Sequence, residues 1–322
     1  MGRNIESICD LCGGDSWRRI ARRDRRGMPL DTGICIRCGL ISHLPLPDAE
    51  AIARYYAEEY RRDYHGERTP APRRVMRAWR NGQRIHRMLA PFVPPQGRVF
   101  EVGAGLGCTL KVFQHHGFRT GGIEPNRDFN RYSREVLRAA VANCDLFELD
   151  RPEEHDLVLL VHVIEHFRSP TAALCRIREL VADGGLLYVE CPDVTAPFAP
   201  FGRLFHFAHI HNFAPETLTA LAAKCGFRVE RRLHPEGHPD LALLLRKVEM
   251  PRRPPSFPAG QSAAIEARMR RYGLIGYHLR PAYLRRRTAK LAAYARERLT
   301  ARAFVTRLAE RCRLDPRPEK AA

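Results

Sequence analysis

The alternation of apolar and polar positions predicts strands and helices in turn through the middle of the chain. Apolar runs of strand length precede Gly103 and cover 157–164, and each is followed by a segment compatible with a helix. Ser169 and Pro170 are typical of a helix start, with an N-cap residue followed by proline. Strands that alternate with helices favour a parallel sheet with helices on both faces. We therefore predict a doubly wound α/β fold around a mostly parallel, seven-stranded sheet.

The same pattern divides the chain into four regions. Residues 1–45 carry two cysteine pairs, and residues 46–95 hold a polar linker followed by a helical cap with apolar positions at helical spacing. The alternating strands and helices occupy residues 96–249. Residues 250–322 begin with a proline-rich linker and continue as arginine-rich, amphipathic helical segments. The linker of the second region carries four tyrosines that we expect on one helix face: Tyr55, Tyr56, Tyr60 and Tyr64.

The 322-residue chain has a formal net charge of +18, and the excess of basic residues lies in the two flanks of a nearly neutral centre. A basic amphipathic tail can pack on its own domain, lie on an anionic membrane surface, or bind a polyanion. We prefer packing, with membrane contact second. The chain has no apolar run of membrane-spanning length, and its first residues lack an apolar signal core. We therefore expect a cytoplasmic protein, peripheral at most to the inner membrane surface.

Two Cys-x-x-Cys-Gly sequences form a candidate metal site in the first region. Cys9 and Cys12 make one pair, and Cys35 and Cys38 make the other. Four thiolates at such spacing are typical of tetrahedral zinc, and the glycine after each pair frees backbone amides to turn toward the sulfurs. Four thiolates leave no open position for water, so we predict a structural zinc ion. Disulfides are the alternative, and a cytosolic setting disfavours them.

The turn after the first strand of the central region carries the most specific motif. It reads Glu101-Val-Gly103-Ala-Gly105-Leu-Gly107 and leads into a helix-compatible segment. A dinucleotide-binding loop would place its third glycine five positions after the first, where this chain has Cys108. The turn instead resembles the first motif of the class I S-adenosylmethionine-dependent methyltransferases.

This resemblance implies S-adenosylmethionine as the cofactor. Glu101 would orient the loop and the methionine end of the cofactor, and Glu124, which closes the next strand, would take the ribose hydroxyls. Asp145 would contact the adenine amine, although an aspartate that caps a turn is an almost equally weighted alternative. The predicted cofactor-binding residues are Glu101, Gly103, Gly105, Gly107, Glu124, Asp145 and His162.

Residues 156–167 are similar to the fourth motif of the same family, with Ile164 at a position where leucine is commoner. The carboxyl ends of parallel strands face the ligand crevice of such folds. The resemblance therefore directs His162, Glu165 and His166 toward the cofactor or the acceptor.

An aromatic loop over 192–213 contains one third of the 15 phenylalanines and three histidines. We expect it to pack over an acceptor pocket, because such crowding is unfavourable in water. The stretch from His209 to Leu218 is similar to a His-Leu-x-x-Phe-Ser-x-x-Thr-Leu element of small-molecule and sugar methyltransferases. A histidine with an unperturbed pKa of about 6.5 suits removal of the acceptor proton. We predict His209 as the general base, His166 second and His211 third, with Glu165 in the same catalytic group. A core histidine bonded to backbone is the alternative for each.

The resemblance implies methyl transfer to an oxygen or carbon of a sugar, glycan or small metabolite. An RNA methyltransferase is the first alternative, supported by the cysteine pairs and the basic flanks. The fourth motif lacks the Asn/Asp-Pro-Pro-aromatic sequence of amine methylators, and aromatic residues do not alternate with the basic runs. Nucleic acid is therefore the less favoured partner. A non-catalytic binding module is the second alternative, and the intact glycine turn argues against it.

Overall fold

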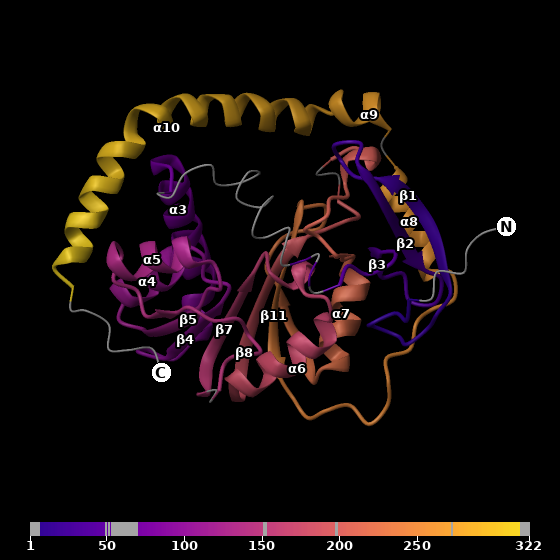
Figure 1. Ribbon diagram of the computed structural model, residues 1–322, viewed down its shortest axis with the longest axis horizontal. Helices are drawn as coiled ribbons and strands as arrows, with labels where there is room; N and C mark the ends of the chain where they lie inside the picture. The colour runs from indigo at the N-terminus through magenta and orange to yellow at the C-terminus, as the bar shows by residue number, and fades with distance from the viewer. Residues whose placement is uncertain are drawn as a thin grey trace. The chain divides into compact units, whose positions relative to one another are not determined.

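The computed structural model describes residues 7–48, 50, 52, 70–150, 153–196, 199–271 and 273–315 (Figure 1). The chain forms two compact units. The first unit combines Met1–Tyr60, Val161–Arg178 and Tyr188–Leu284, and the second combines Arg61–Leu160, Glu179–Leu187 and Arg285–Ala322. The units therefore do not follow the four consecutive regions expected from the sequence. The predicted helix face with Tyr55, Tyr56, Tyr60 and Tyr64 lies outside the described residues.

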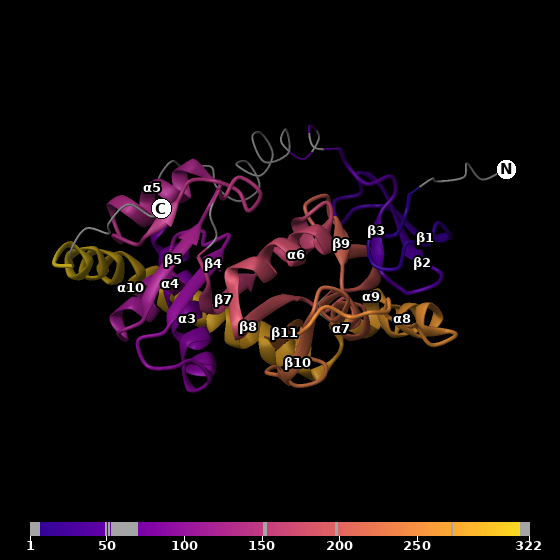
Figure 2. The same cartoon turned by 90° about the horizontal axis from the view of Figure 1, so that it is seen from below.

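One sheet has seven strands. In sheet order they are β10 (Phe227–Arg232), β11 (Asp240–Lys247), β8 (Val181–Pro192), β7 (His155–Val161), β4 (Arg98–Val102), β5 (Arg119–Ile123) and β6 (Val141–Ala142). β4 pairs in parallel with β5 and β7, β5 pairs in parallel with β6, and β10 and β11 are antiparallel. Helices flank this sheet, and the predicted doubly wound, mostly parallel α/β fold is confirmed (Figure 2).

The strand order places a ligand crevice by topology. β5 and β6 lie on one side of β4, and β7 lies on the other side, so the connections reverse direction at β4. In open α/β sheets, ligands bind beyond the carboxyl ends of the strands at such a switch point. The turn with Gly103, Gly105 and Gly107 follows the carboxyl end of β4, which is the position that this rule selects.

The second unit packs its helices around a common apolar cluster. They are α3 (Pro72–Leu89), η2 (Ala90–Phe92), α4 (Cys108–His115), α5 (Arg127–Glu135) and the part of α10 (Pro281–Arg313) from Arg285 onward. Val75 and Trp79 of α3 pack with Val112 of α4 and with Leu308 and Cys312 of α10. The end of the basic tail therefore packs on its own domain, as preferred from the sequence.

Polar contacts fix the end of α10 as well. Lys111 of α4 is fully buried, and its Nζ lies 2.7 Å from Oδ2 of Asp315. The same Nζ donates to Oε1 of Gln114 at 2.9 Å. Arg77 of α3 forms an ion pair with Glu297 of α10 at 2.7 Å. These contacts hold the tail by charge in addition to apolar packing.

The first unit contains a four-stranded antiparallel sheet in the order β1-β2-β3-β9, with bounds Trp17–Arg23 (β1), Pro29–Cys35 (β2), Ile41–His43 (β3) and His211–Asn212 (β9). β3 pairs with β9 through Ile41 opposite Asn212 and Ser42 opposite His211. The N-terminal module therefore takes its last strand from the end of the aromatic loop. The helices of this unit are η3 (Ile164–His166), α6 (Pro170–Leu180), η4 (Phe201–Arg203), α7 (Pro215–Lys224), α8 (Gln261–Arg270) and α9 (Leu274–His278).

Helix α8 covers one face of this small sheet (Figures 1 and 2). Ile265 and Met269 of α8 are buried with Ile34 of β2 and Ile41 of β3, and Phe205 of the aromatic loop joins the same cluster. Arg18 of β1 also forms an ion pair with Glu266 of α8. The sheet is therefore closed by an element from beyond the proline-rich linker.

Among the helices of the described residues, none is long and apolar enough to cross a membrane.

We predict that Asp315→Asn lowers the free energy of unfolding by about 1 to 3 kcal/mol, because it leaves the buried ammonium of Lys111 without its anionic partner. Chemical denaturation followed by fluorescence measures this change. Glu310→Gln is the matched control, since Glu310 is exposed near the end of α10, just before Asp315. Equal stability of the two variants would show that the ion pair does not hold the tail.

Candidate active site

The glycine turn is built for a close ligand. Gly103, Gly105 and Gly107 have φ of +72°, +55° and +71°, a region that favours glycine. A Cβ at Gly107 would lie 2.9 Å from Cβ of Ser133, so this position also serves packing. A Cβ at Gly105 would have no described atom within 4 Å. Gly105 therefore lines open space, and its backbone can be approached from that side.

Glu124 holds the turn in place. Its Oε2 accepts a hydrogen bond from the backbone N–H of Gly105 at 2.7 Å, and its Oε1 accepts one from Asn126 at 2.8 Å. The carboxylate is buried, and burial raises the pKa of Glu124 although these two hydrogen bonds lower it. Glu124 therefore connects the end of β5 to the turn after β4.

Glu101 is the least satisfied acid of the second unit. Its side chain is only 4% exposed, and it takes a hydrogen bond from Thr109. Its Oε2 has no hydrogen-bond partner among the described residues. Burial and the negative charge of Glu124 raise the pKa of Glu101 to about 8. A cationic donor placed at this oxygen would satisfy it and would favour the carboxylate.

Asp145 caps a turn beyond β6. Its Oδ1 accepts hydrogen bonds from the backbone N–H groups of Phe147 at 2.7 Å and Glu148 at 3.0 Å. The side chain is exposed. The capping alternative therefore describes what this aspartate does in the structure, and a contact to adenine stays a prediction.

A cluster of histidines and acids follows β7 and β8 in the first unit. His162 has a positive φ of 53°, which is rare for a residue with a side chain. Its Nδ1 lies 3.6 Å from Oε1 of Glu165, and its Nε2 lies 3.7 Å from Oε1 of Glu190. Burial lowers the pKa of His162, but these two carboxylates outweigh burial and raise the pKa to about 9. His162 is thus a cation at neutral pH, held between two acids.

Glu165 is a second buried acid that is incompletely hydrogen-bonded, and it lies in the first unit. It is 1% exposed, and neither of its carboxylate oxygens has a hydrogen-bond partner among the described residues. Nε2 of His209 lies 3.8 Å from its Oε1. Glu165, His166 and His209 each bring one ligand atom within 4.8 Å of the others. The structure therefore brings together three of the four predicted catalytic residues.

The predicted bases differ in what they contact. Burial, followed by the electrostatic influence of the neighbouring His206 and His166, lowers the pKa of His209 well below 6.5. His209 is therefore neutral at pH 7 and can accept a proton. Nδ1 of His166 donates to the carbonyl of Ala208 at 2.7 Å.

His211 is bonded on both ring nitrogens. Its Nε2 contacts the carbonyl of Arg168 at 3.1 Å, and its Nδ1 contacts Oγ of Ser42 at 2.8 Å. Because a carbonyl can only accept, Nε2 donates and Nδ1 accepts from the serine. Both nitrogens are thereby used to connect β9 with β3 and with the segment before α6. This arrangement matches the alternative of a core histidine and argues against His211 as the base.

Sequence reasoning missed two acids of this cluster. Glu190 is buried near the carboxyl end of β8, and Asp240 begins β11; each brings a ligand atom within 4.8 Å of His162. The Tyr188 hydroxyl donates a hydrogen bond to Glu190. An acid near the carboxyl end of a strand is the signal that identified Glu124, and the same signal could have identified Glu190.

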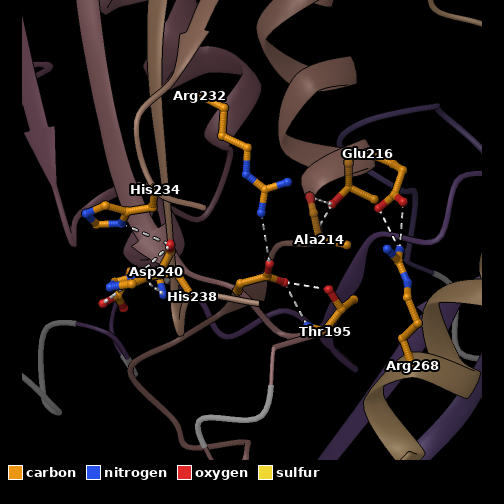
Figure 3. A network of polar contacts seen from close by, with 10 residues as sticks. Thr195, Ala214, Glu216, Arg232, His234, His238, Asp240 and Arg268 are labelled. Atoms are coloured by element: carbon orange, nitrogen blue, oxygen red, sulfur yellow. Dashed lines mark hydrogen bonds and ion pairs between the residues drawn. The ribbon is translucent and has the colours of Figure 1, made fainter. Parts of the chain in front are cut away.

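A polar network beside the cluster orders the chain between β8 and α7 (Figure 3). The carboxylate of Asp193 accepts from the backbone and hydroxyl of Thr195 at 2.9 and 2.7 Å and lies 4.0 Å from Arg232. Arg268 of α8 forms two 2.7 Å hydrogen bonds with Glu216 of α7. These bonds fix the two ends of the aromatic loop.

The four N-terminal cysteines converge as predicted. One sulfur from each lies within 4.8 Å of the others, with 3.5 Å between Cys9 and Cys38 and between Cys12 and Cys35. Hydrogen bonds from Cys38 and Cys9 lower the pKa of Cys35 to about 2, so one thiolate is stabilised by neighbouring thiols. Four thiolates need a cation at their centre, and this donor set fits zinc.

Asp10, inside the first cysteine pair, attaches this module to α6. Its carboxylate accepts from Oγ of Ser169 at 2.5 Å and from the N–H of Thr171 at 2.8 Å. Its carbonyl accepts from Nζ of Lys224 at 2.6 Å. The helix that follows Glu165 and His166 is therefore capped by the cysteine module.

Comparisons with known proteins identify a methyltransferase domain in this chain. A family model described as a methyltransferase domain matches residues 72–231. An uncharacterized protein of Mycobacterium tuberculosis is 27% identical over 139 residues, which is 39% of this chain and 44% of that protein. The tRNA U34 carboxymethyltransferase of Vibrio atlanticus is 26% identical over 148 residues, which is 42% of this chain and 46% of that enzyme. The chain thus spans less than half the length of these curated relatives.

Solved structures resemble the fold at low identity. A 1,6-didemethyltoxoflavin-N1-methyltransferase of Burkholderia thailandensis aligns with a TM-score of 0.49 and 21% identity, covering 67% of this chain and 98% of that chain. A structure from Archaeoglobus fulgidus aligns with a TM-score of 0.45 and 18% identity, covering 60% of this chain and all of that chain.

Proposed function

Because residues 72–231 place this chain in the class I S-adenosylmethionine-dependent methyltransferase family, we propose that it transfers a methyl group to an oxygen or carbon of a small metabolite, sugar or glycan. The observation that carries the proposal is the pair of buried, incompletely bonded acids. Glu101 stands beside the glycine turn, and Glu165 stands in the histidine cluster. Each has an oxygen that could accept a hydrogen bond from a bound ligand.

The glycine turn and the acids near it would bind the cofactor. When bound, S-adenosylmethionine would supply an electrophilic sulfonium methyl group, which would pass to the acceptor with S-adenosylhomocysteine as the leaving group. Glu101 would bind the ammonium of its methionine end, and Glu124 would bind the ribose hydroxyls. Gly105 would let the backbone approach, since nothing described lies within 4 Å of its added Cβ. Asp145 and His162 remain weaker candidates for cofactor contact.

The first unit supplies the acid–base residues. His209 is neutral at pH 7, and its Nε2 lies 3.8 Å from the carboxylate of Glu165. We propose that Nδ1 of His209 takes the acceptor proton and that Glu165 stabilises the imidazolium so formed, which is the usual logic of an oriented base. His166 completes the group, since one of its ring nitrogens lies within 4.8 Å of ligand atoms of Glu165 and His209.

The size of the neighbouring cavity favours a small acceptor. A cavity of about 290 Å³ is lined by His206 and His209. Pockets for small molecules are commonly about 300 to 1,000 Å³, so the cavity suits one sugar-sized group. The relative that acts on tRNA keeps RNA as the second candidate.

The experiment that tests the function follows radiolabelled methyl from S-adenosylmethionine into small-molecule, glycan and RNA fractions of a cell extract. With the acceptor in hand, His209→Ala should lower turnover roughly 100- to 10,000-fold and leave cofactor affinity unchanged. Because the pKa of His209 lies well below 6.5, kcat/KM should show no loss of a base near pH 6.5. His278→Ala, at an exposed histidine of the same unit, is the control. Full turnover by His209→Ala would move the base to His166 or Glu165, and label in RNA would favour the second candidate.

We predict that S-adenosylmethionine binding releases a proton from Glu101. At pH 6.5 this acid is protonated, because its pKa is about 8, and pairing with an ammonium requires the carboxylate. Below pH 8 the affinity should therefore rise with pH, by up to about tenfold per pH unit. Calorimetry at pH 6.5 in buffers of different ionisation enthalpy counts the proton. Glu101→Gln should release none, and the same count in both proteins would refute the role.

We propose that the four cysteines hold one structural zinc ion per chain. Metal analysis of protein purified without chelator should give about one zinc, and Cys35→Ser should lose it. Cys175→Ser is the matched control, because this exposed cysteine lies outside the cluster. A zinc content near zero in the unmodified protein would refute the site.

A further inference from the structure

The cavity beside His209 has a strongly basic wall. Arg25 and Arg203 line it together with His206 and His209, and Asp240 is the one acid among its described lining residues. Asp240 also lies near the cationic His162. The cavity lining therefore carries two arginines against one acid.

Arg25 reaches this wall from the N-terminal module. It lies in the turn between β1 and β2, and its backbone N–H donates to the carbonyl of Phe205 at 2.8 Å. The adjacent Asp24 uses its carboxylate within the turn, where Oδ1 accepts from Arg26 and Met28 at 2.8 Å. Asp24 therefore bonds within the turn itself, and the bond to Phe205 fixes the backbone of Arg25 against the aromatic loop.

The guanidinium of Arg25 is close enough to act on the cavity histidines. Burial lowers the pKa of His206 to about 3, and the charge of Arg25 is the next largest cause. The same charge contributes to the low pKa of His209. Arg203 ends η4 within the aromatic loop and is exposed at the cavity. The two arginines therefore come from separate segments and meet at one cavity.

We propose that this cavity binds an anionic group of the methyl acceptor, a phosphate or a carboxylate, through Arg25 and Arg203. The inference rests on the proposed methyl transfer, because it states which charge the methyl acceptor carries near the proposed base. Arginine suits the role, since its planar fork bonds both oxyanions with two parallel hydrogen bonds. The cysteine module then contributes a specificity residue to the site in addition to its structural role.

The test measures anion binding by the full-length, zinc-loaded protein at low salt. Pyrophosphate and malonate are the two probes, and calorimetry gives their affinities. Arg25→Ala and Arg203→Ala should each weaken binding about tenfold or more, as expected for lost bonds to a charged group. Arg25→Lys should restore part of it, and Arg22→Ala is the matched control, since Arg22 is exposed on the same hairpin.

The outcomes separate the two sources of negative charge. Tighter pyrophosphate binding indicates a phosphorylated acceptor, and tighter malonate binding indicates a carboxylated one. Absence of saturable binding, or equal losses in Arg22→Ala and Arg25→Ala, would overturn the proposal. S-adenosylmethionine affinity, measured in the same variants, should stay at the wild-type value. Failure of wild-type protein to bind this cofactor would instead contradict the proposed function and leave the anion result to stand by itself.

Discussion

Two buried acids with incompletely bonded oxygens, Glu101 and Glu165, underlie the proposed binding of the cofactor and the acceptor. A buried acid without a partner costs free energy, and proteins rarely keep one without a use for it. Because the pKa of Glu101 is about 8, this acid is largely protonated at neutral pH, which lowers the cost of burying it. Glu165 instead lies near imidazole nitrogens of His162 and His209, at 3.6 and 3.8 Å, which are too distant for good hydrogen bonds. Both acids mark places where a ligand would complete the structure.

The N-terminal module belongs to the same unit as the proposed base His209. Its sheet closes with β9, its Ser42 bonds His211, and its Asp10 caps the helix after Glu165. Loss of the proposed zinc ion would therefore disturb the segments on either side of His209 as well as the cysteine pairs. These contacts give a physical reason why a structural site of four thiolates occurs in a chain whose proposed reaction takes place away from the cysteines.

Local sequence signals predicted much of the fold and the position of the glycine turn that we propose as the cofactor site. Glycine spacing after a strand identified the turn, and the acid at the end of β5 identified Glu124, because both depend on residues near in sequence. The bond from Gly105 to Glu124 shows that these two signals meet in space. The amphipathic pattern of residues 250–322 likewise predicted that the tail packs; Leu308 near its end does so, whereas Leu284 and Leu299 are exposed.

Long-range pairings could not be predicted in this way. The contact of Ser42 with His211 joins residues that are 169 positions apart, and it turns a candidate base into a structural residue. Arg25 and Asp240 carry no motif, and only the tertiary fold brings them to the cavity beside His209. Asp145 was ambiguous for another reason, since a capping aspartate and a ligand-binding one look the same in sequence.

The central claim is that Glu101 and Glu165, which are buried and incompletely hydrogen-bonded, bind ligands. Thermal unfolding of Glu101→Gln tests this claim most directly. Wild-type protein at a hundredfold excess of S-adenosylmethionine over Kd should gain about 2.7 kcal/mol of stability. Glu101→Gln should be at least as stable as wild type without ligand and should gain much less from it. Glu135→Gln, at an exposed acid of the same unit, should behave as wild type. A Glu101→Gln protein that is weakened without ligand and fully stabilised by it would show that this acid serves the fold, and would contradict the account.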